Sequence, residues 1–187
     1  MVTVSESENL DAVFKPKSIA VVGTSRKHGT IGRQILHNLV AYGFNGPVYP
    51  VNPKTRYVNS IKCYPSVSSI PDPVDMAVIV VPKEFVLSVA EECGEKGVSG
   101  LVVISAGFRE IGDKGLALEK QLVDLVRKYD MRLVGPNCMG VINTDQDVRM
   151  DATFGTTLPL VGHVGFMSQS GALGNIILEY ADELKTG

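Results

Sequence analysis

A glycine-containing turn follows the first apolar run of the sequence and could hold phosphate. It reads VVGTSRKHGTIG over residues 21–32 and places glycines at 23, 29 and 32. A turn of this kind between a strand and a helix offers backbone N–H groups and the positive end of the helix dipole to an anion. The spacing differs from the GxGxxG of dinucleotide-binding domains. The turn therefore predicts an anion site, but it does not indicate which anion binds.

Cationic side chains accompany this turn. Arg26 and Lys27 lie within it, and Lys54 follows the second apolar run in the stretch VNPK. NAD-binding domains usually place Asp or Glu after the second strand, where it accepts hydrogen bonds from ribose hydroxyls. Asn52 stands at that place here, and VNPK contains no acid. Three cations and no acid for the ribose favour a ligand richer in phosphate than NAD, and NADP remains compatible. The alternative is that the three cations are solvated surface charges.

A second polar turn, SQSG at residues 168–171, precedes a helical pattern. A strand, SQSG and a helix in succession could form a hydrolase nucleophile elbow with Ser170 exposed. Such a triad needs an acid and then a histidine later in the chain, and no histidine follows His163. A hydrolase is therefore disfavoured, and an ordinary serine cap on a helix is the simpler interpretation.

The cysteines predict free thiols. Cys63, Cys93 and Cys138 are odd in number, far apart and without a CxxC pair, which favours a reduced cytoplasmic protein over a disulfide framework or a zinc site. Cys138 could be a nucleophile, but a buried structural thiol is the preferred interpretation because no base is assigned to it. A net charge of −2 gives no reason to expect nucleic acid or an anionic membrane as partner. No apolar run approaches the roughly 20 residues that span a bilayer.

Strand and helix patterns alternate along the first part of the chain. Parallel strands buried on both faces read as continuous apolar runs, and ligands bind beyond their carboxyl ends. The pattern predicts a doubly wound parallel sheet over residues 10–145, with the site on the loops after Val22, Val51, Val81, Ile104 and Val134. The expected strands are 18–23, 47–52, 76–81, 100–105 and 131–135, and the expected helices are 30–42, 85–93 and 118–129.

Past residue 150 a new unit is expected. Residues 164–167 have the pattern of a strand, and apolar residues from Leu173 to Leu184 recur at helical spacing. One strand and one helix cannot bury a core of their own. We therefore expect a linker at 146–160 and, at 161–187, the first βα unit of a second, truncated domain.

Several stretches together resemble the NDP-forming acyl-CoA synthetases. This family includes the ADP-forming acetate–CoA ligases and is related to the α subunit of succinyl-CoA synthetase. The resemblance runs from about residue 12 to about residue 180 and is carried, in order, by FKPKSIAVVGTSRKHGTIG, VYPVNPK, CYPSV, VDMAVIVVP, VVISAGFRE, RLVGPNCMGVIN and GFMSQSGALG. It implies a Rossmann-like CoA-binding domain followed by the start of a second, flavodoxin-like α/β domain.

The resemblance also implies roles for residues. The first turn would hold the phosphates of coenzyme A, with Lys54 adding a charge, and other loops would line the path of the pantetheine arm. The implied CoA-binding residues are Gly23, Ser25, Arg26, Lys27, His28, Lys54, Val81, Pro82, Ile104, Ser105 and Ala106. The turn made of Ser168, Gln169, Ser170 and Gly171 would receive the phosphoryl group of a phosphohistidine.

The reaction implied is the ligation of a small carboxylic acid to CoA with cleavage of ATP to ADP and phosphate, through acyl phosphate and phosphohistidine. His28, His37 and His163 do not stand where the family places its phosphohistidine, so no catalytic residue is expected in this chain and it should be inactive alone. ATP, ADP and Mg²⁺ would belong to a separate ATP-handling domain or β subunit, and the assembly could be oligomeric. Two alternatives stay open: a non-catalytic CoA-sensing module fused to an acetyltransferase, and an NADP-dependent oxidoreductase domain.

Overall fold

Five short parallel strands form the central sheet. The structure is a computed structural model that describes residues 10–187. The strands are β1 (Ile19–Val22), β2 (Val48–Val51), β5 (Met76–Ile79), β6 (Gly100–Val103) and β7 (Arg132–Val134). They lie in the order β2-β1-β5-β6-β7, and every neighbouring pair is parallel. Each predicted strand of the first domain contains one of them, so the predicted doubly wound sheet is confirmed.

The helices between the strands also follow the prediction. They are α2 (Ile31–Tyr42), α3 (Lys83–Lys96) and α4 (Asp113–Lys128). A short helix α1 (Asp11–Phe14) precedes β1, and a 3₁₀ turn η1 (Arg109–Ile111) precedes α4. α2 and α3 end at Gly43 and Gly97, which adopt the left-handed conformation. The helix α3 continues through Gly94. A side chain at Gly94 would collide with the ring of Tyr129, so this glycine serves the packing of α3 against α4.

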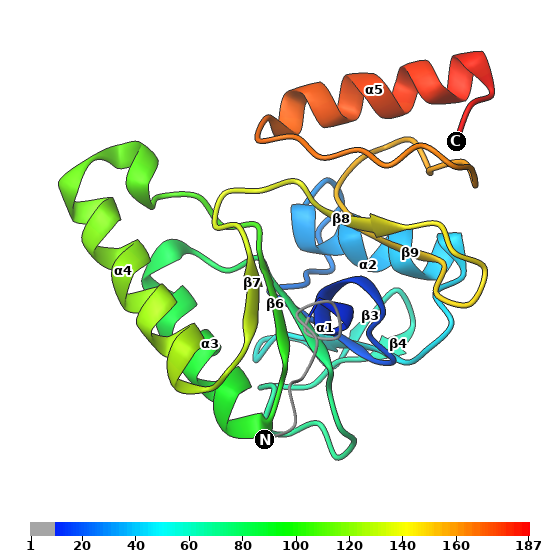
Figure 1. The fold of residues 1–187 in the computed structure, drawn as a ribbon. Helices are drawn as coiled ribbons and strands as arrows, with labels where there is room; N and C mark the ends of the chain where they lie inside the picture. Colours follow the sequence, from blue (N-terminus) through cyan, green and yellow to red (C-terminus); the bar gives the residue numbers. More distant parts are fainter. Residues whose placement is uncertain (1–9) are drawn as a thin grey trace, which may run out of the picture.

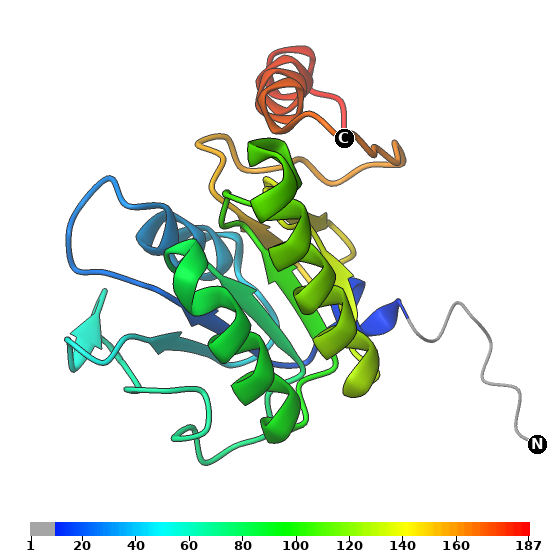
Figure 2. The same cartoon turned by 90° about the vertical axis from the view of Figure 1, so that its left-hand side faces the viewer.

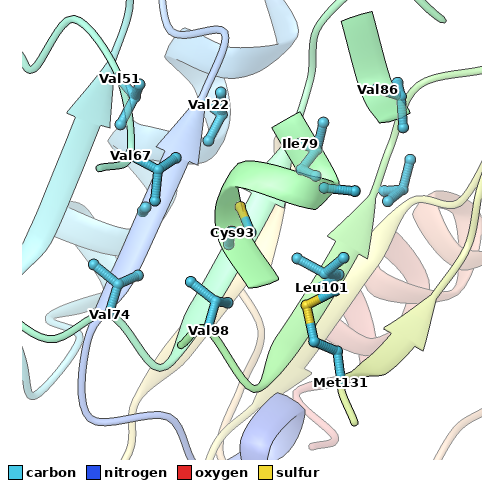
Figure 3. Packing of buried hydrophobic residues seen from close by; sticks show 14 of the residues in the cluster. Val22, Val51, Val67, Val74, Ile79, Val86, Cys93, Val98, Leu101 and Met131 are labelled. Carbon is cyan, nitrogen blue, oxygen red and sulfur yellow. The ribbon is translucent and has the colours of Figure 1, made fainter. Parts of the chain in front are cut away.

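The sheet is buried on both faces because successive strand residues point to opposite sides. Ala20 and Val22 face α3 and α4, and Ile19 and Val21 face α2. Figure 2 shows α3 and α4 side by side over the first face, and Figure 3 shows the cluster of buried side chains beneath them. Both faces need a cover of helices, which explains the unbroken apolar runs in the sequence.

Two hairpins lie outside the predicted elements. β3 (Tyr57–Val58) pairs with β4 (Ile61–Lys62), and β8 (Gly140–Asn143) pairs with β9 (Met150–Thr153), both antiparallel. All four residues of β9 are buried, and they pack with α2 on the second face of the sheet (Figure 1). The predicted linker at 146–160 therefore contains a strand of the packed core. Sequence periodicity could not show this, because the β9 segment MDAT carries a buried aspartate in a very short strand.

The predicted strand at 164–167 is wrong, whereas the helix after it is present as α5 (Gly171–Leu184). A strand needs a neighbouring strand that receives its backbone hydrogen bonds, and within residues 10–187 this segment joins no β-ladder, although the N–H of Val164 donates to the carbonyl of Gly187 at 3.4 Å. Its side chains are exposed, Met167 to 97%. In Figure 1, α5 lies beyond one end of the sheet, apart from the helices that cover its faces.

Candidate functional site

The candidate site lies where the strand order reverses. The chain passes from β1 outward to β2 and then returns to β5 on the other side of β1. The connections at the carboxyl ends of β1 and β5 therefore diverge and leave a crevice, which is the usual place for a ligand in an open α/β sheet. The turn that begins at Gly23 and the segment from Val80 to Pro82 border this point.

Glycines let the backbones approach closely here. Gly23 has a φ of 99°, and a Cβ on it would stand 2.5 Å from the carbonyl oxygen of Val80. A Cβ on Gly32, in the first turn of α2, would stand 2.6 Å from the carbonyl oxygen of Gly23. Both contacts are shorter than a real side chain tolerates. The two glycines therefore bring the turn, the β5 connection and the start of α2 together.

The turn itself is held by its own side chains. The backbone N–H of Lys27 donates to Ser25 Oγ at 3.1 Å, and Thr30 Oγ1 donates to the Lys27 carbonyl at 3.0 Å. Arg33 on α2 donates to the carbonyl of Arg26 at 2.7 Å. Thr30 caps the start of α2 without a side-chain hydrogen bond, so the first N–H groups of the helix are not capped by it. The side chains of Arg26, Lys27 and His28 are exposed.

Asn52 joins this turn to the loop after β2. Its Nδ2 donates to the carbonyl of Thr24 at 2.5 Å, and its Oδ1 accepts the backbone N–H of Lys54 at 2.8 Å. These bonds bring Lys54 to the same edge of the sheet as Arg26. None of Arg26, Lys27 and Lys54 forms an ion pair in the part of the chain that the structure describes. Unpaired cations beside uncapped helix N–H groups make this edge suited to a polyanionic ligand.

The loops after β5, β6 and β7 are also linked. Ser105 Oγ donates to the carbonyl of Val81 at 2.5 Å, and the N–H of Asn137 donates to the carbonyl of Ser105 at 3.0 Å. The predicted pantetheine-lining residues therefore lie on connected loops: Val81 and Ser105 are partly buried, Ile104 is buried, and Pro82 and Ala106 are exposed.

Gly107, in the loop after β6, makes its contacts within the protein. Its N–H donates to Glu110 Oε1 at 2.5 Å, and this bond is the main reason that the pKa of Glu110 lies below its usual value. A Cβ on Gly107 would also collide with the side chain of Lys83. The glycine is thus explained by local packing and by its φ of 106°.

The SQSG turn caps α5. Ser170 Oγ accepts the N–H of Leu173 at 3.4 Å, and Ser168 Oγ accepts the N–H of Ser170 at 3.0 Å. A Cβ on Gly174 would stand 2.9 Å from Met139 Sδ, so the first turn of α5 packs on the loop that follows β7. The turn predicted to receive phosphate therefore lies beside the last of the loops predicted to line the site.

The thiols are poor nucleophiles. Burial raises the pKa of Cys138 to about 11 and that of Cys93 to about 12, and it also raises the pKa of Cys63. Cys138 Sγ donates to the carbonyl of Val103 at 3.4 Å. A thiol that is protonated at neutral pH and bonded to a backbone carbonyl fits a structural role, as the sequence indicated.

Within residues 10–187, no histidine belongs to a group of three or more His, Cys, Asp or Glu residues placed to hold a metal ion. His28 and His37 line one pocket of about 440 Å³ between α2 and the β3–β4 hairpin, together with Gly29, Arg33, Gln34, Val40, Asn59 and Ile61. His163 is exposed, and its backbone N–H donates to the carbonyl of Gly187 at 2.8 Å. No role in phosphoryl transfer follows from these positions.

Sequence reasoning missed the residues that brace the loops. Asn52, Arg33 and Glu110 each hold a loop of the site through a hydrogen bond to backbone. A signal existed for Asn52, because Asn followed by Pro favours a turn in which the side chain accepts the N–H two residues later. The sequence could not predict the partner of its Nδ2, because Thr24 lies 28 residues earlier in the chain.

Comparison with known proteins agrees with this geometry. Residues 17–144 match the family described as CoA binding domain. The chain is 49% identical over 183 residues to the α subunit of ADP-forming acetate–CoA ligase I from Pyrococcus furiosus, covering 96% of this chain and 39% of that protein. It is 43% identical to the ADP-forming 4-hydroxybutyrate–CoA ligase of Nitrosopumilus maritimus, over 90% of this chain and 24% of that protein.

A solved structure shares the fold over nearly the whole chain. The dinucleotide-forming acetyl-coenzyme A synthetase 1 of Candidatus Korarchaeum cryptofilum, in complex with phosphate and ADP, superposes with a TM-score of 0.86 at 47% identity. The match covers 92% of this chain and 36% of that one. This chain thus spans less than half the length of each of these three proteins.

Among the described helices, none combines the length and the apolar character that crossing a bilayer requires. The parallel sheet, the glycine turn at its switch point and the unpaired cations around that turn occur together within the matched residues 17–144. The chain belongs to the CoA binding domain family.

Proposed function

We propose that this chain is the CoA-binding portion of an ADP-forming acid–CoA ligase. The observation that carries the proposal is the pair of loops joined by Asn52, which gathers Arg26, Lys27 and Lys54 around the turn at Gly23. CoA carries a diphosphate and a 3′-phosphate, so it matches an edge with several unpaired cations and no acid for a ribose. The relatives named as ADP-forming CoA ligases support the same ligand and reaction class.

In this proposal the ligand crosses the carboxyl edge of the sheet. Its phosphates lie on the turn made of Gly23, Ser25, Arg26, Lys27 and His28, near Lys54. The pantetheine arm runs past Val81, Pro82, Ile104, Ser105 and Ala106 toward the loop after β7. The linked loops and the contact of Met139 with α5 support this direction, because they lead from the β1 turn toward SQSG.

The turn Ser168–Gly171 is proposed to receive a phosphoryl group. Its hydroxyls and the N-terminus of the 14-residue α5 provide donors and a favourable dipole for an anion. In the overall reaction ATP phosphorylates a histidine and leaves as ADP, the phosphohistidine passes its phosphoryl group to the carboxylate of the acid, and the thiol of CoA attacks the acyl carbon of the resulting acyl phosphate and releases phosphate. None of the described residues is given a covalent role in these steps.

The remaining parts of the reaction are proposed to lie elsewhere in the assembly. An ATP-handling domain or β subunit would bind ATP, ADP and Mg²⁺, in keeping with relatives that are longer than this chain or are named as subunits. The acid is a carboxylic acid of unspecified identity, since relatives at 49% and 43% identity are named for different acids. The free thiols Cys63, Cys93 and Cys138 support a cytoplasmic location. Neither the CoA-sensing module nor the NADP-dependent oxidoreductase gains support from these relatives.

CoA is expected to raise the melting temperature of this chain, and NAD is not. A ligand at 100 times its dissociation constant stabilises the folded state by about 2.7 kcal/mol, which a thermal-shift measurement resolves easily. NAD and NADP at the same concentrations serve as controls. Stabilisation by NADP with no effect of CoA would refute the proposed ligand and restore the oxidoreductase hypothesis.

Lys54→Ala is expected to weaken CoA binding by about 1–3 kcal/mol, because a charge-assisted contact to phosphate is lost. Titration calorimetry with CoA and with dephospho-CoA measures the change and tells whether the 3′-phosphate is the partner. Lys120→Ala is the matched control, since Lys120 is equally an exposed lysine but lies on α4. Equal CoA affinity in the Lys54→Ala variant and the wild type would show that Lys54 does not contact CoA and is a solvated surface charge.

A further inference from the structure

Asn52 occupies a distinctive place in the proposed site. It is the first residue after β2, where dinucleotide-binding domains carry the acid that binds a ribose. Here both functional atoms of its side chain are used within the protein: Nδ2 donates to the Thr24 carbonyl, and Oδ1 accepts the Lys54 N–H. The side chain therefore contacts the two segments that carry the unpaired cations.

The backbone of Asn52 is anchored as well. Its N–H donates to the carbonyl of Tyr64 at 2.8 Å, and the thiol of Cys63 donates to its carbonyl at 3.7 Å. On the other side, the N–H of Gly23 donates to the carbonyl of Val51 at 3.0 Å. Because its main chain is held at both ends, the side chain of Asn52 can transmit this fixed position to the two loops.

We infer that Asn52 is a positioning residue of the CoA site, which holds Lys54 and the turn after Gly23 at the separation that the ligand's phosphates require. The inference rests on the proposed function. Lys54 is exposed and separated from β2 only by Asn52 and Pro53, so the bond from its N–H to Oδ1 fixes where its side chain starts. Without that bond, ordering the loop becomes a cost of binding.

The amide is the group that suits this role. It donates and accepts at once, which an aspartate of the same size does not do at neutral pH. A carboxylate here would face the carbonyl of Thr24 and would also repel phosphate. Serine keeps only part of the function, because its hydroxyl accepts the N–H two residues later in a weaker version of the same turn.

The test measures CoA binding by calorimetry in the wild type, Asn52→Ala, Lys54→Ala and the double variant. Asn52→Ala is expected to weaken CoA about tenfold, the scale of ordering a small loop on binding. The loss should be clearly smaller in the Lys54→Ala background, because Asn52 acts partly through Lys54, and neighbouring residues then show coupling. If Asn52 merely supported folding, its substitution would lower the free energy of unfolding, and the coupling between Asn52 and Lys54 in CoA binding would be zero.

Asn52→Ser keeps the test valid if Asn52→Ala does not fold. The Asn52→Ser variant is expected to bind CoA more weakly than the wild type. The same substitution should reduce the affinity for CoA by a smaller factor when it is made in the Lys54→Ala background. Equal losses in the two backgrounds, or wild-type affinity in both Asn52 variants, would overturn the inference while CoA binding by the wild type kept the proposed function intact. A wild-type chain that does not bind CoA would overturn both.

Discussion

Gly23→Ala is expected to destabilise the fold by about 2–6 kcal/mol and to abolish CoA binding. The estimate joins a strained left-handed conformation, about 1–3 kcal/mol, with overpacking, about 1–3 kcal/mol. Gly23 has a φ of 99°, and the added methyl would stand 2.5 Å from the Val80 carbonyl oxygen and 3.2 Å from Val81 Cγ1. Relief requires the turn or the β5 connection to move, and both border the proposed site. Urea unfolding and calorimetry with CoA measure the two effects.

Gly29→Ala is the matched control for this change. Gly29 lies in the same turn with a φ of 75°, but a Cβ there has no neighbouring atom within 4 Å. Only the backbone strain, about 1–2 kcal/mol, should appear in its free energy of unfolding. Similar unfolding free energies for the two variants would show that the close approach of Gly23 to Val80 contributes nothing to stability.

Asp151→Asn is expected to stabilise the protein at pH 7.5. Asp151 is fully buried on β9, and its Oδ1 accepts from the N–H and the hydroxyl of Thr153. Its Oδ2 has no hydrogen-bond partner within the described residues 10–187. Burial raises its pKa from 3.8 to about 6. Each pH unit corresponds to about 1.4 kcal/mol, so keeping this carboxylate ionised in the fold costs up to about 3 kcal/mol.

The pH dependence follows from the direction of that change. Since the folded state binds the proton more tightly than the unfolded state, this group makes the free energy of unfolding fall as the pH rises from about 4 to about 6. Asparagine keeps an oxygen for Thr153 and carries no charge. The Tyr42 hydroxyl is another buried atom that has no hydrogen-bond partner among residues 10–187. Burial raises the pKa of Tyr42, the charge of Arg149 opposes this, and the charge of Asp151 adds to it.

Urea unfolding at pH 4 and pH 7.5 provides the measurement. The variant should gain about 2–3 kcal/mol over the wild type at pH 7.5 and little at pH 4. Asp147→Asn serves as control, because Asp147 is exposed in the same β8–β9 hairpin and should change stability little at either pH. A difference between Asp151→Asn and the wild type that stays constant from pH 4 to pH 7.5 would show that the carboxyl does not titrate as its burial indicates.

The β8–β9 hairpin and the segment at 164–167 show where sequence patterns stop being sufficient. Residues 164–167 have an apolar strand pattern, but within the described chain they join no β-ladder, and their side chains are exposed. The segment MDAT has a weaker pattern, yet it forms a buried strand because β8 and α2 lie beside it. Strand formation depends on a neighbouring backbone, and local periodicity does not report that neighbour.

The strands of the central sheet, its three long helices, the glycine turn and the excess of cations beside it could all be predicted from the sequence. Those features are local: unbroken apolar runs, helical spacing and glycines each act within a few residues of chain. Which loops lie together at one edge of the sheet depends on contacts between distant parts of the chain. Placing β2 and β5 on either side of β1 brings Asn52 against Thr24 and Gly23 against Val80, and packing Met139 on Gly174 brings the SQSG turn to the β7 loop. These contacts join residues that are distant in the chain, so they follow from strand order and packing, which no short stretch of sequence encodes.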